Sequence, residues 1–181
     1  FYIEILRYSM KSTVELRPLA STDESTFITD LQEAFSIAIN REFGPQTQPS
    51  VKDYQIKAVL AKPNTDNYFI YHDNVYVGGA IIEIDESTQI NKLDLMYLKP
   101  EAQSLGIGMD TWLAIEALYP GTKIWEVHTP YYEKRNIHFY VNKCGFHIVE
   151  FFSPIHPNPH GPNSDREFEQ YFFRFQKEMK K

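Results

Sequence analysis

The sequence predicts a single α+β domain in which a mixed, mostly antiparallel, twisted sheet is flanked by helices. Three observations support this fold class. Apolar residues make up 43% of the 181 residues, and a chain of this size buries roughly 70% of its surface in one core. Segments of alternating apolar and polar residues indicate strands, and apolar residues at three- and four-residue spacing indicate helices. The later helices lie between strands, which permits parallel neighbours.

The N-terminal part is predicted to form a short strand and two helices. Residues 14–19 alternate apolar and polar side chains up to a proline, which is typical of a strand. Ser21 and Glu24 have the spacing of a capping box, and apolar residues then recur at helical spacing up to Gly44. A shorter helix is expected from Ser50 to the break at residues 62–63, with Asp53 placed to meet its free N–H groups.

The middle of the chain is predicted to form a hairpin and one further strand. Residues 67–71 and 75–82 alternate with period two on either side of a turn at Asp73 and Asn74. Residues 92–98 form the next strand, which ends before Pro100 because proline cannot donate to a sheet.

The C-terminal half is predicted to alternate helices and strands. The expected elements are a loop at 101–108, a helix up to residue 119, a strand at 122–128, a helix at 131–143, and strands at 146–152 and 169–176. The longest irregular stretch, residues 153–166, lies before the last strand. A loop of that length within a compact domain is more often functional than idle.

Composition excludes several classes of partner. The net charge is −6 and no long run of Lys or Arg occurs, so neither nucleic acid nor a membrane surface is expected as a partner. The single cysteine, Cys144, permits no internal disulfide, which favours a cytoplasmic location. Cys144 is predicted to be a packing residue. Residues 1–9 are interpreted as an N-terminal extension or an expression remnant ahead of a domain at 10–181.

Two glycines mark a candidate phosphate-binding turn between a strand and a helix. Glycines allow backbone N–H groups to converge on one point, and a helix N-terminus adds partial positive charge. No Gly-Lys-Ser/Thr follows, so the segment is not a P-loop. The alternative is an ordinary strand-to-helix turn. The residues of this turn are Gln103, Ser104, Leu105, Gly106, Ile107 and Gly108.

This turn and two downstream segments resemble the GNAT superfamily of acetyl-CoA-dependent N-acyltransferases. The Gln-x-x-Gly-x-Gly pattern follows a strand that ends near Leu98, and residues 136–140 and 143–146 continue the resemblance. The element order over residues 14–179 is also similar. The resemblance implies acetyl-CoA as cosubstrate, with its pyrophosphate on the N–H groups of residues 103–108. The further cofactor-binding residues that it implies are Tyr97, Leu98, Asn136 and Lys143.

The resemblance also implies that Tyr140 donates a proton to the leaving thiolate. A tyrosine hydroxyl is an available donor for a group whose conjugate acid has a pKa of about 8.5. The family commonly places the tyrosine four positions before the Gly-Phe pair, whereas Tyr140 precedes Gly145 by five, which would put Val141 in its place. A helical bulge or a different helix end would restore Tyr140, and the alternative role is that of a core aromatic. Ser104 and Leu105 also replace small and basic residues, which weakens the electrostatic support for phosphate.

Asp94 and Glu126 are candidate general bases, because burial would raise the pKa of a strand carboxylate toward the useful range. Glu126 shares a strand face with His128. The alternative for either acid is a satisfied structural carboxylate. His156 and His160 supply too few ligands for a metal, and none is expected.

The sequence therefore predicts an N-acetyltransferase that acts on a primary amine of a small molecule or peptide by direct attack in a ternary complex. The acceptor is expected to enter between the N-terminal helices and residues 153–166, and aromatic strand edges offer a homodimer contact. A non-catalytic acetyl-CoA-binding sensor module is the alternative, and a scaffold with a vestigial turn is a third interpretation.

Overall fold

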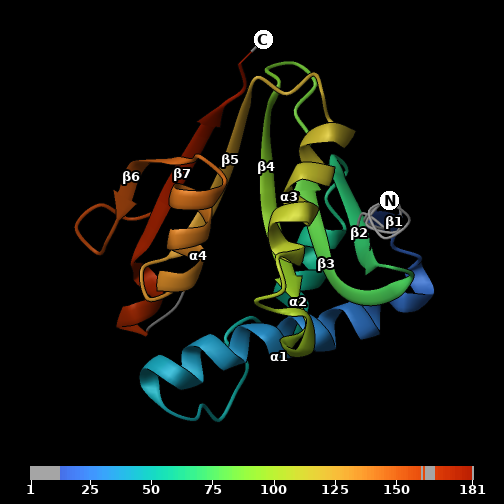
Figure 1. The fold of residues 1–181 in the computed structure, drawn as a ribbon. Coiled ribbons are helices and arrows are strands. Elements are labelled where there is room, and N and C mark those ends of the chain that lie inside the picture. The colour runs from blue at the N-terminus through green and yellow to red at the C-terminus, as the bar shows by residue number, and fades with distance from the viewer. Residues whose placement is uncertain (1–12, 160, 162–165, 181) are drawn as a thin grey trace, which may run out of the picture.

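The computed structural model describes residues 13–159, 161 and 166–180, and these form one seven-stranded sheet with helices against it (Figure 1). The expectations for residues 1–9 and for His160 lie outside the described residues. The α+β prediction is confirmed. The strands are β1 (Val14–Pro18), β2 (Thr65–His72), β3 (Val75–Glu83), β4 (Ile90–Leu98), β5 (Ile124–Pro130), β6 (His147–Phe152) and β7 (Phe172–Glu178). The α-helices are α1 (Glu24–Phe43), α2 (Asp53–Leu60), α3 (Ile107–Leu118) and α4 (Lys134–His138).

The sheet has the order β1-β2-β3-β4-β5-β7-β6. All neighbours are antiparallel except β4 and β5, which are parallel because α3 crosses between them. Their pairing ends at Leu93 and Val127. Beyond this point the two strands separate, and Figure 1 shows them close together at the top and apart at the bottom.

A β-bulge lies at the point where β4 and β5 separate. Ile81 of β3 pairs with Leu95, whereas Ile82 pairs with Leu93, so Asp94 is left without a partner on β3. An unpaired residue of this kind bends its strand and redirects the neighbouring groups. The bulge and the end of the parallel pairing together form what we call the fork, made by residues 93–95 of β4 and 127–128 of β5.

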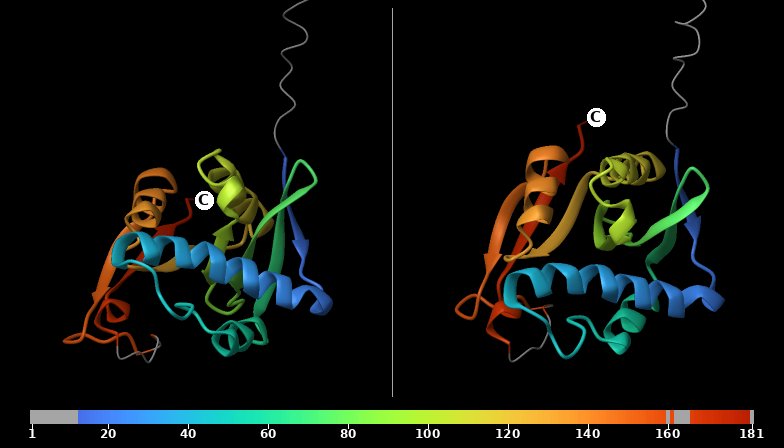
Figure 2. Two further views of the ribbon diagram at one scale, coloured as in Figure 1. Left: turned by 90° about the horizontal axis from the view of Figure 1, so that it is seen from below. Right: turned by 60° about the horizontal axis from the view of Figure 1, so that its bottom comes forward.

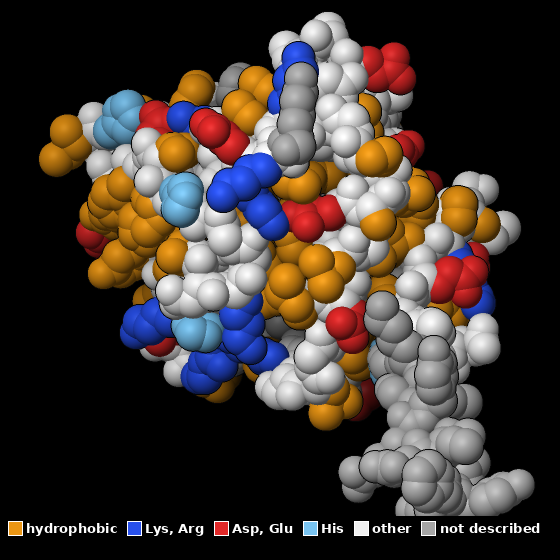
Figure 3. All heavy atoms as spheres, turned by 45° about the horizontal axis from the view of Figure 1, so that its top comes forward, with side chains coloured by type: hydrophobic (Ala, Val, Ile, Leu, Met, Phe, Trp, Pro, Cys, Tyr) orange, Lys and Arg blue, Asp and Glu red, His pale blue; other side chains and the backbone are white. Residues whose placement is uncertain are grey.

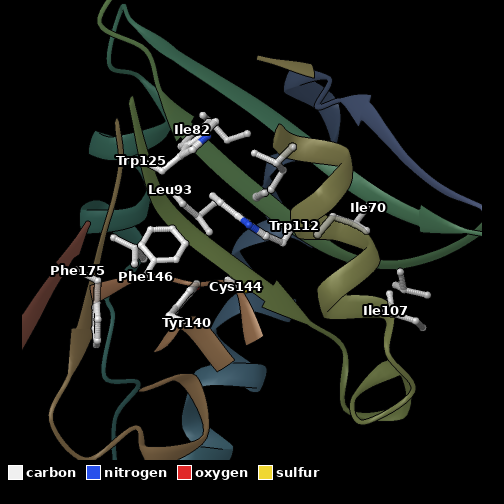
Figure 4. Packing of buried hydrophobic residues seen from close by; sticks show 14 of the residues in the cluster. Ile70, Ile82, Leu93, Ile107, Trp112, Trp125, Tyr140, Cys144, Phe146 and Phe175 are labelled. Atoms are coloured by element: carbon white, nitrogen blue, oxygen red, sulfur yellow. The ribbon is translucent and has the colours of Figure 1, made fainter. Parts of the chain in front are cut away.

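Two apolar clusters cover the two faces of the sheet. One lies on the face of α3 and α4 and includes Trp112, Trp125 and Phe146 (Figure 4). The other lies under α1 and α2 and includes Phe27 and Leu31. Helix α1 runs beneath both halves of the sheet (Figure 2). Its N-terminal half packs in the second cluster. Its last residue, Phe43, stacks on Phe168 of the other half at a ring-centroid distance of 4.2 Å.

The predicted starts of the two N-terminal helices are wrong by three residues. Ser21–Asp23 forms a 3₁₀ turn without a side-chain cap, so the predicted capping box does not form and α1 begins at Glu24. Helix α2 begins at Asp53 rather than Ser50, because the side chain of Gln55 accepts the backbone N–H of Lys52 at 2.8 Å.

Two C-terminal elements also begin later than predicted. Helix α4 begins at Lys134 rather than residue 131, after a turn in which the N–H of Glu133 bonds the carbonyl of Pro130. Strand β7 begins at Phe172 rather than residue 169. Glu169 instead lies in the 3₁₀ turn Glu167–Gln170, where it pairs with Arg166 one turn away.

Candidate functional site

The predicted phosphate turn joins the end of β4 to the start of α3. Gly106 lies in the left-handed region at φ +83° and precedes the first residue of α3, a conformation that favours glycine. The side-chain amide of Gln103 donates to the carbonyl of Leu98 at 3.0 Å and ties the turn to the strand. The first N–H groups of a helix have no partner within it. The turn therefore presents N–H groups at the end of β4.

Arg135 supplies a positive charge to this turn that the sequence analysis missed. Its guanidinium donates to the side-chain oxygen of Gln103 at 2.6 Å and to the hydroxyl of Ser104 at 3.1 Å. The basic residue that is missing from the turn itself thus comes from α4. The only signal in the sequence was its position next to Asn136.

One pocket of about 350 Å³ brings α1, β4, the turn and α4 together. Arg41, Arg135 and Lys143 line it, so its wall carries positive charge although the whole chain has a net charge of −6. Figure 3 shows Lys and Arg side chains gathered in groups on one face of the molecule, with hydrophobic side chains between them. The predicted site residues that line the pocket are Tyr97, Leu98, Gln103, Ser104, Gly106, Gly108, Asn136, Tyr140 and Lys143.

Four predicted site residues lie away from the pocket lining. Leu105 is 69% exposed, and Ile107 is buried in the core cluster of α3, so only their backbone groups remain available to a ligand at the turn. Asp94 and Glu126 are not among the pocket-lining residues either.

A π-helical turn, Phe139–Lys143, follows α4 and carries Tyr140. The N–H of Cys144 bonds the carbonyl of Phe139 five residues earlier at 3.0 Å. Such a turn accommodates one extra residue and is frequent at functional sites. The extra residue between the tyrosine and Gly145 is therefore absorbed, and Tyr140 rather than Val141 lines the pocket.

The hydroxyl of Tyr140 has no hydrogen-bond partner among the residues that the structure describes, although its ring is 6% exposed and packs on Phe146. Figure 4 shows Tyr140 near Phe146 and Cys144. Burial raises the pKa of Tyr140. The hydroxyl is thus protonated at neutral pH and free to donate into the pocket.

The side chain of Tyr97 is held on the opposite face from α3. Its hydroxyl lies 2.8 Å from that of Tyr76, which donates to Asp30 at 2.7 Å. Tyr97 belongs to the part of β4 that has left β5, so its backbone edge is unpaired on that side. A ligand with amide groups can add to such an edge.

Both predicted bases are already paired. Asp94 lies 3.1 Å from the amine of Lys62. Glu126 lies 3.6 Å from His128 and accepts hydrogen bonds from Gln176 at 2.9 Å and Arg174 at 3.0 Å. These contacts lower the pKa of Glu126 to about 2, against the opposing effect of burial. A carboxylate of such low basicity is a weak proton acceptor at neutral pH, so this geometry disfavours Glu126 as the general base.

The contacts of Glu126 predict a loss of stability in acid. Its folded pKa of about 2 lies below the ordinary value of 4.5, so the stabilisation is complete above about pH 4.5 and is lost as the pH falls toward 2. At pH 6 we expect the free energy of unfolding of the wild type to be about 2 kcal/mol larger than that of Glu126→Gln. Urea titrations from pH 6 to pH 2.5 measure this difference, which should shrink with acidification. A constant difference would contradict the prediction.

Glu133 is a pocket-lining carboxylate that the sequence analysis missed. No hydrogen bond or ion pair engages its side chain among the described residues. Burial raises the pKa of Glu133, and Arg41 and Arg135 oppose this effect. Nothing in the local sequence distinguishes it from a solvent-exposed helix-start acid.

No group of three His, Cys, Asp or Glu side chains that could hold a metal occurs within residues 13–159, 161 and 166–180. His156 contacts Glu150 at 2.8 Å. Cys144 is 3% exposed in the core, and burial raises its pKa to about 12, so its predicted packing role is confirmed. No helix in the described part of the chain could span a membrane.

A known family model and a curated protein match this chain. The model of the acetyltransferase (GNAT) family matches residues 28–146. The uncharacterized protein YrkN of Bacillus subtilis (strain 168) is 47% identical over 167 residues, which cover 88% of this chain and 90% of that protein.

Solved structures of low sequence identity share the fold. An acetyltransferase from Thermus thermophilus is 14% identical with a TM-score of 0.66, over 92% of this chain and 97% of that chain. Spermidine N-acetyltransferase from Vibrio cholerae, in complex with CoA and spermine, has the same identity and a TM-score of 0.66, over 91% and 95%. PaiA N-acetyltransferase from Thermoplasma acidophilum, in complex with coenzyme A, is 16% identical with a TM-score of 0.61, over 92% and 99%.

Proposed function

Since this chain belongs to the GNAT family of acetyltransferases, we propose that it transfers the acetyl group of acetyl-CoA to a primary amine of a small molecule or peptide. The amine attacks the thioester directly, with both substrates bound. The observation that supports this proposal most is that one pocket is lined by the separated end of β4, the phosphate turn and the hydroxyl-bearing Tyr140.

In this proposal the groups that line the pocket bind the cofactor. The backbone N–H of Gln103 already bonds the carbonyl of Pro100 at 3.3 Å, so the pyrophosphate binds the N–H groups of residues 104–108, with Arg135 beside them. The pantetheine arm pairs with the backbone of Tyr97 and Leu98. Asn136 and Lys143 contact the cofactor from α4 and the π-helical turn. Two proteins with this fold, from V. cholerae and T. acidophilum, were solved with CoA. The part of the arm nearest the thioester then lies at the fork.

The chemical step needs a stabilised oxyanion and a proton for the leaving thiolate. Backbone N–H groups at the bulge of β4 can stabilise the oxyanion, and Tyr140 supplies the proton. Because the Tyr140 hydroxyl has no other partner among the described residues, it can turn toward the sulfur without breaking a bond.

Two measurements test the proposal together. Calorimetric titration with acetyl-CoA and CoA measures binding, and a free-thiol release assay over polyamines, aminoglycosides and peptides measures transfer. We expect binding of acetyl-CoA and thiol release that depends on one class of amine. Absence of binding would contradict the role of the turn.

A non-catalytic acetyl-CoA sensor is the second candidate, favoured by the pairing of both predicted bases, Asp94 and Glu126. It predicts tight binding without thiol release for every amine in the panel. A scaffold with a vestigial turn predicts no binding. A cytoplasmic location stays a prediction from the sequence.

A homodimer through the edge strand β6 is part of the proposal. This strand ends the sheet, and its Ile148, Val149 and Phe151 are 48%, 45% and 43% exposed; apolar edges of this kind invite pairing. We expect light scattering to give the mass of two chains, and Ile148→Lys with Phe151→Glu to give one. Val75→Lys is the matched control, because Val75 is 63% exposed on another strand. A monomeric wild type at every concentration would contradict this prediction.

A further inference from the structure

His128 is the first residue of β5 beyond its pairing with β4. The last pair joins Leu93 and Val127, and both side chains lie in the cluster under α3 and α4. Side chains alternate along a strand, so His128 lies on the other face of the sheet. Asp94 occupies the corresponding place on β4 and contacts Lys62, which follows α2. The two side chains therefore flank the fork on the face that α1 and α2 adjoin.

The imidazole of His128 is held by its neighbours. Its Nε2 lies 3.6 Å from Oε1 of Glu126, and its ring packs on Phe152 at a centroid distance of 5.9 Å. A carboxylate next to one ring nitrogen favours the proton on that nitrogen and leaves the other with a lone pair. The side chain is 34% exposed, so a ligand can reach it.

A second layer of contacts holds Glu126 in turn. Its Oε2 accepts hydrogen bonds from Arg174 and Gln176, which leaves Oε1 directed at His128. Arg174 also donates to Glu150 at 2.8 Å, and Glu150 contacts His156. Strands β5, β6 and β7 thus converge on one carboxylate that faces the imidazole.

We propose that His128 accepts the proton of the incoming ammonium group and that Glu126, fixed by Arg174, positions it. This inference rests on the proposed function. Asp94 is occupied by Lys62, and Glu133 is flanked by Arg41 and Arg135, whose charges disfavour a cation. His128 has instead a carboxylate beside it.

The proton balance closes with the groups present. Nδ1 of His128 takes one proton from R–NH₃⁺, and the neutral nitrogen attacks the thioester carbonyl to form the C–N bond. The C–S bond breaks, and Tyr140 gives its proton to the thiolate. The second amine proton leaves the new amide nitrogen through water and restores Tyr140. His128 then releases its proton to solvent, and the products are the acetylated amine, CoA and one proton.

The test measures kcat/KM against pH for the best amine of the panel. We expect His128→Gln to lower kcat/KM at pH 7 by about 100-fold and to abolish the acidic limb of the profile, which is the fall in kcat/KM toward low pH. The Kd for acetyl-CoA should be unchanged, which also shows that the variant is folded. Hydroxylamine, which is already neutral at pH 7, should be acetylated at similar rates by variant and wild type. The control is His147→Gln on the exposed face of β6, with a profile like the wild type.

Glu126→Gln gives an independent readout of positioning. Because the imidazole then lacks the carboxylate beside its Nε2, kcat should fall several-fold while the KM for the amine and the Kd for acetyl-CoA stay close to those of the wild type. If the wild type is active and His128→Gln keeps both its rate and its acidic limb, the inference is overturned, whereas the proposed transferase activity stands. Loss of the limb in Glu133→Gln instead would assign the proton to Glu133. A wild type that releases no thiol with any amine would remove the proposed function itself.

Discussion

Replacement of Tyr140 by phenylalanine is expected to lower kcat by about 100-fold or more, the usual contribution of a general acid. The Kd for acetyl-CoA should stay within about twofold, because the ring is kept and the hydroxyl has no hydrogen-bond partner among the described residues. For the same reason the free energy of unfolding should change little. Steady-state thiol release and calorimetry measure these quantities.

The matched control is Tyr119→Phe. The Tyr119 hydroxyl donates to Asp66 at 2.7 Å and lies 2.9 Å from that of Tyr68, outside the pocket lining. This variant should lose stability, by about 1 kcal/mol per hydrogen bond, and keep its kcat. Unchanged kcat in Tyr140→Phe would mean that another group, or water, protonates the thiolate.

Replacement of Arg135 by alanine is expected to raise the Kd for acetyl-CoA by about 10- to 100-fold, the range for loss of a charge-assisted hydrogen bond worth about 1.5 to 3 kcal/mol. Arg135 holds Gln103 and Ser104 of the turn at 2.6 and 3.1 Å. Because salt screens the attraction between the Arg135 charge and the pyrophosphate, the acetyl-CoA affinity of the wild type should fall with added salt more steeply than that of the variant.

Acetyl-pantetheine, which lacks the pyrophosphate, separates the role of charge from that of folding. The wild type and Arg135→Ala should bind it equally. The neighbouring Lys134 is 74% exposed and paired with Glu42, so Lys134→Ala serves as the control and should leave acetyl-CoA affinity unchanged. An equal loss of affinity for both ligands in Arg135→Ala would point to a distorted turn.

The sequence by itself determined the element order and the α+β class, because the spacing of apolar residues along each segment is a local property. The hairpin turn at Asp73 and Asn74 has positive φ at both residues, and Gly44 ends α1 at φ +78°, as their types predict. The turn at residues 103–108 is local in the same sense. Helix and strand starts were less predictable, since Gln55 and Glu169 found partners that no periodicity encodes.

The tertiary structure alone decided which side chains meet at the site. Tyr140 reaches the pocket because one π-helical hydrogen bond absorbs an extra residue. Arg135 reaches Ser104 across 31 residues, and Arg174 reaches Glu126 across 48. Such contacts depend on strand order and on where β4 leaves β5. Whether Glu126 is a free base or a fixed carboxylate is therefore set by partners distant in sequence, because a pKa depends on the charges and burial around a group in space.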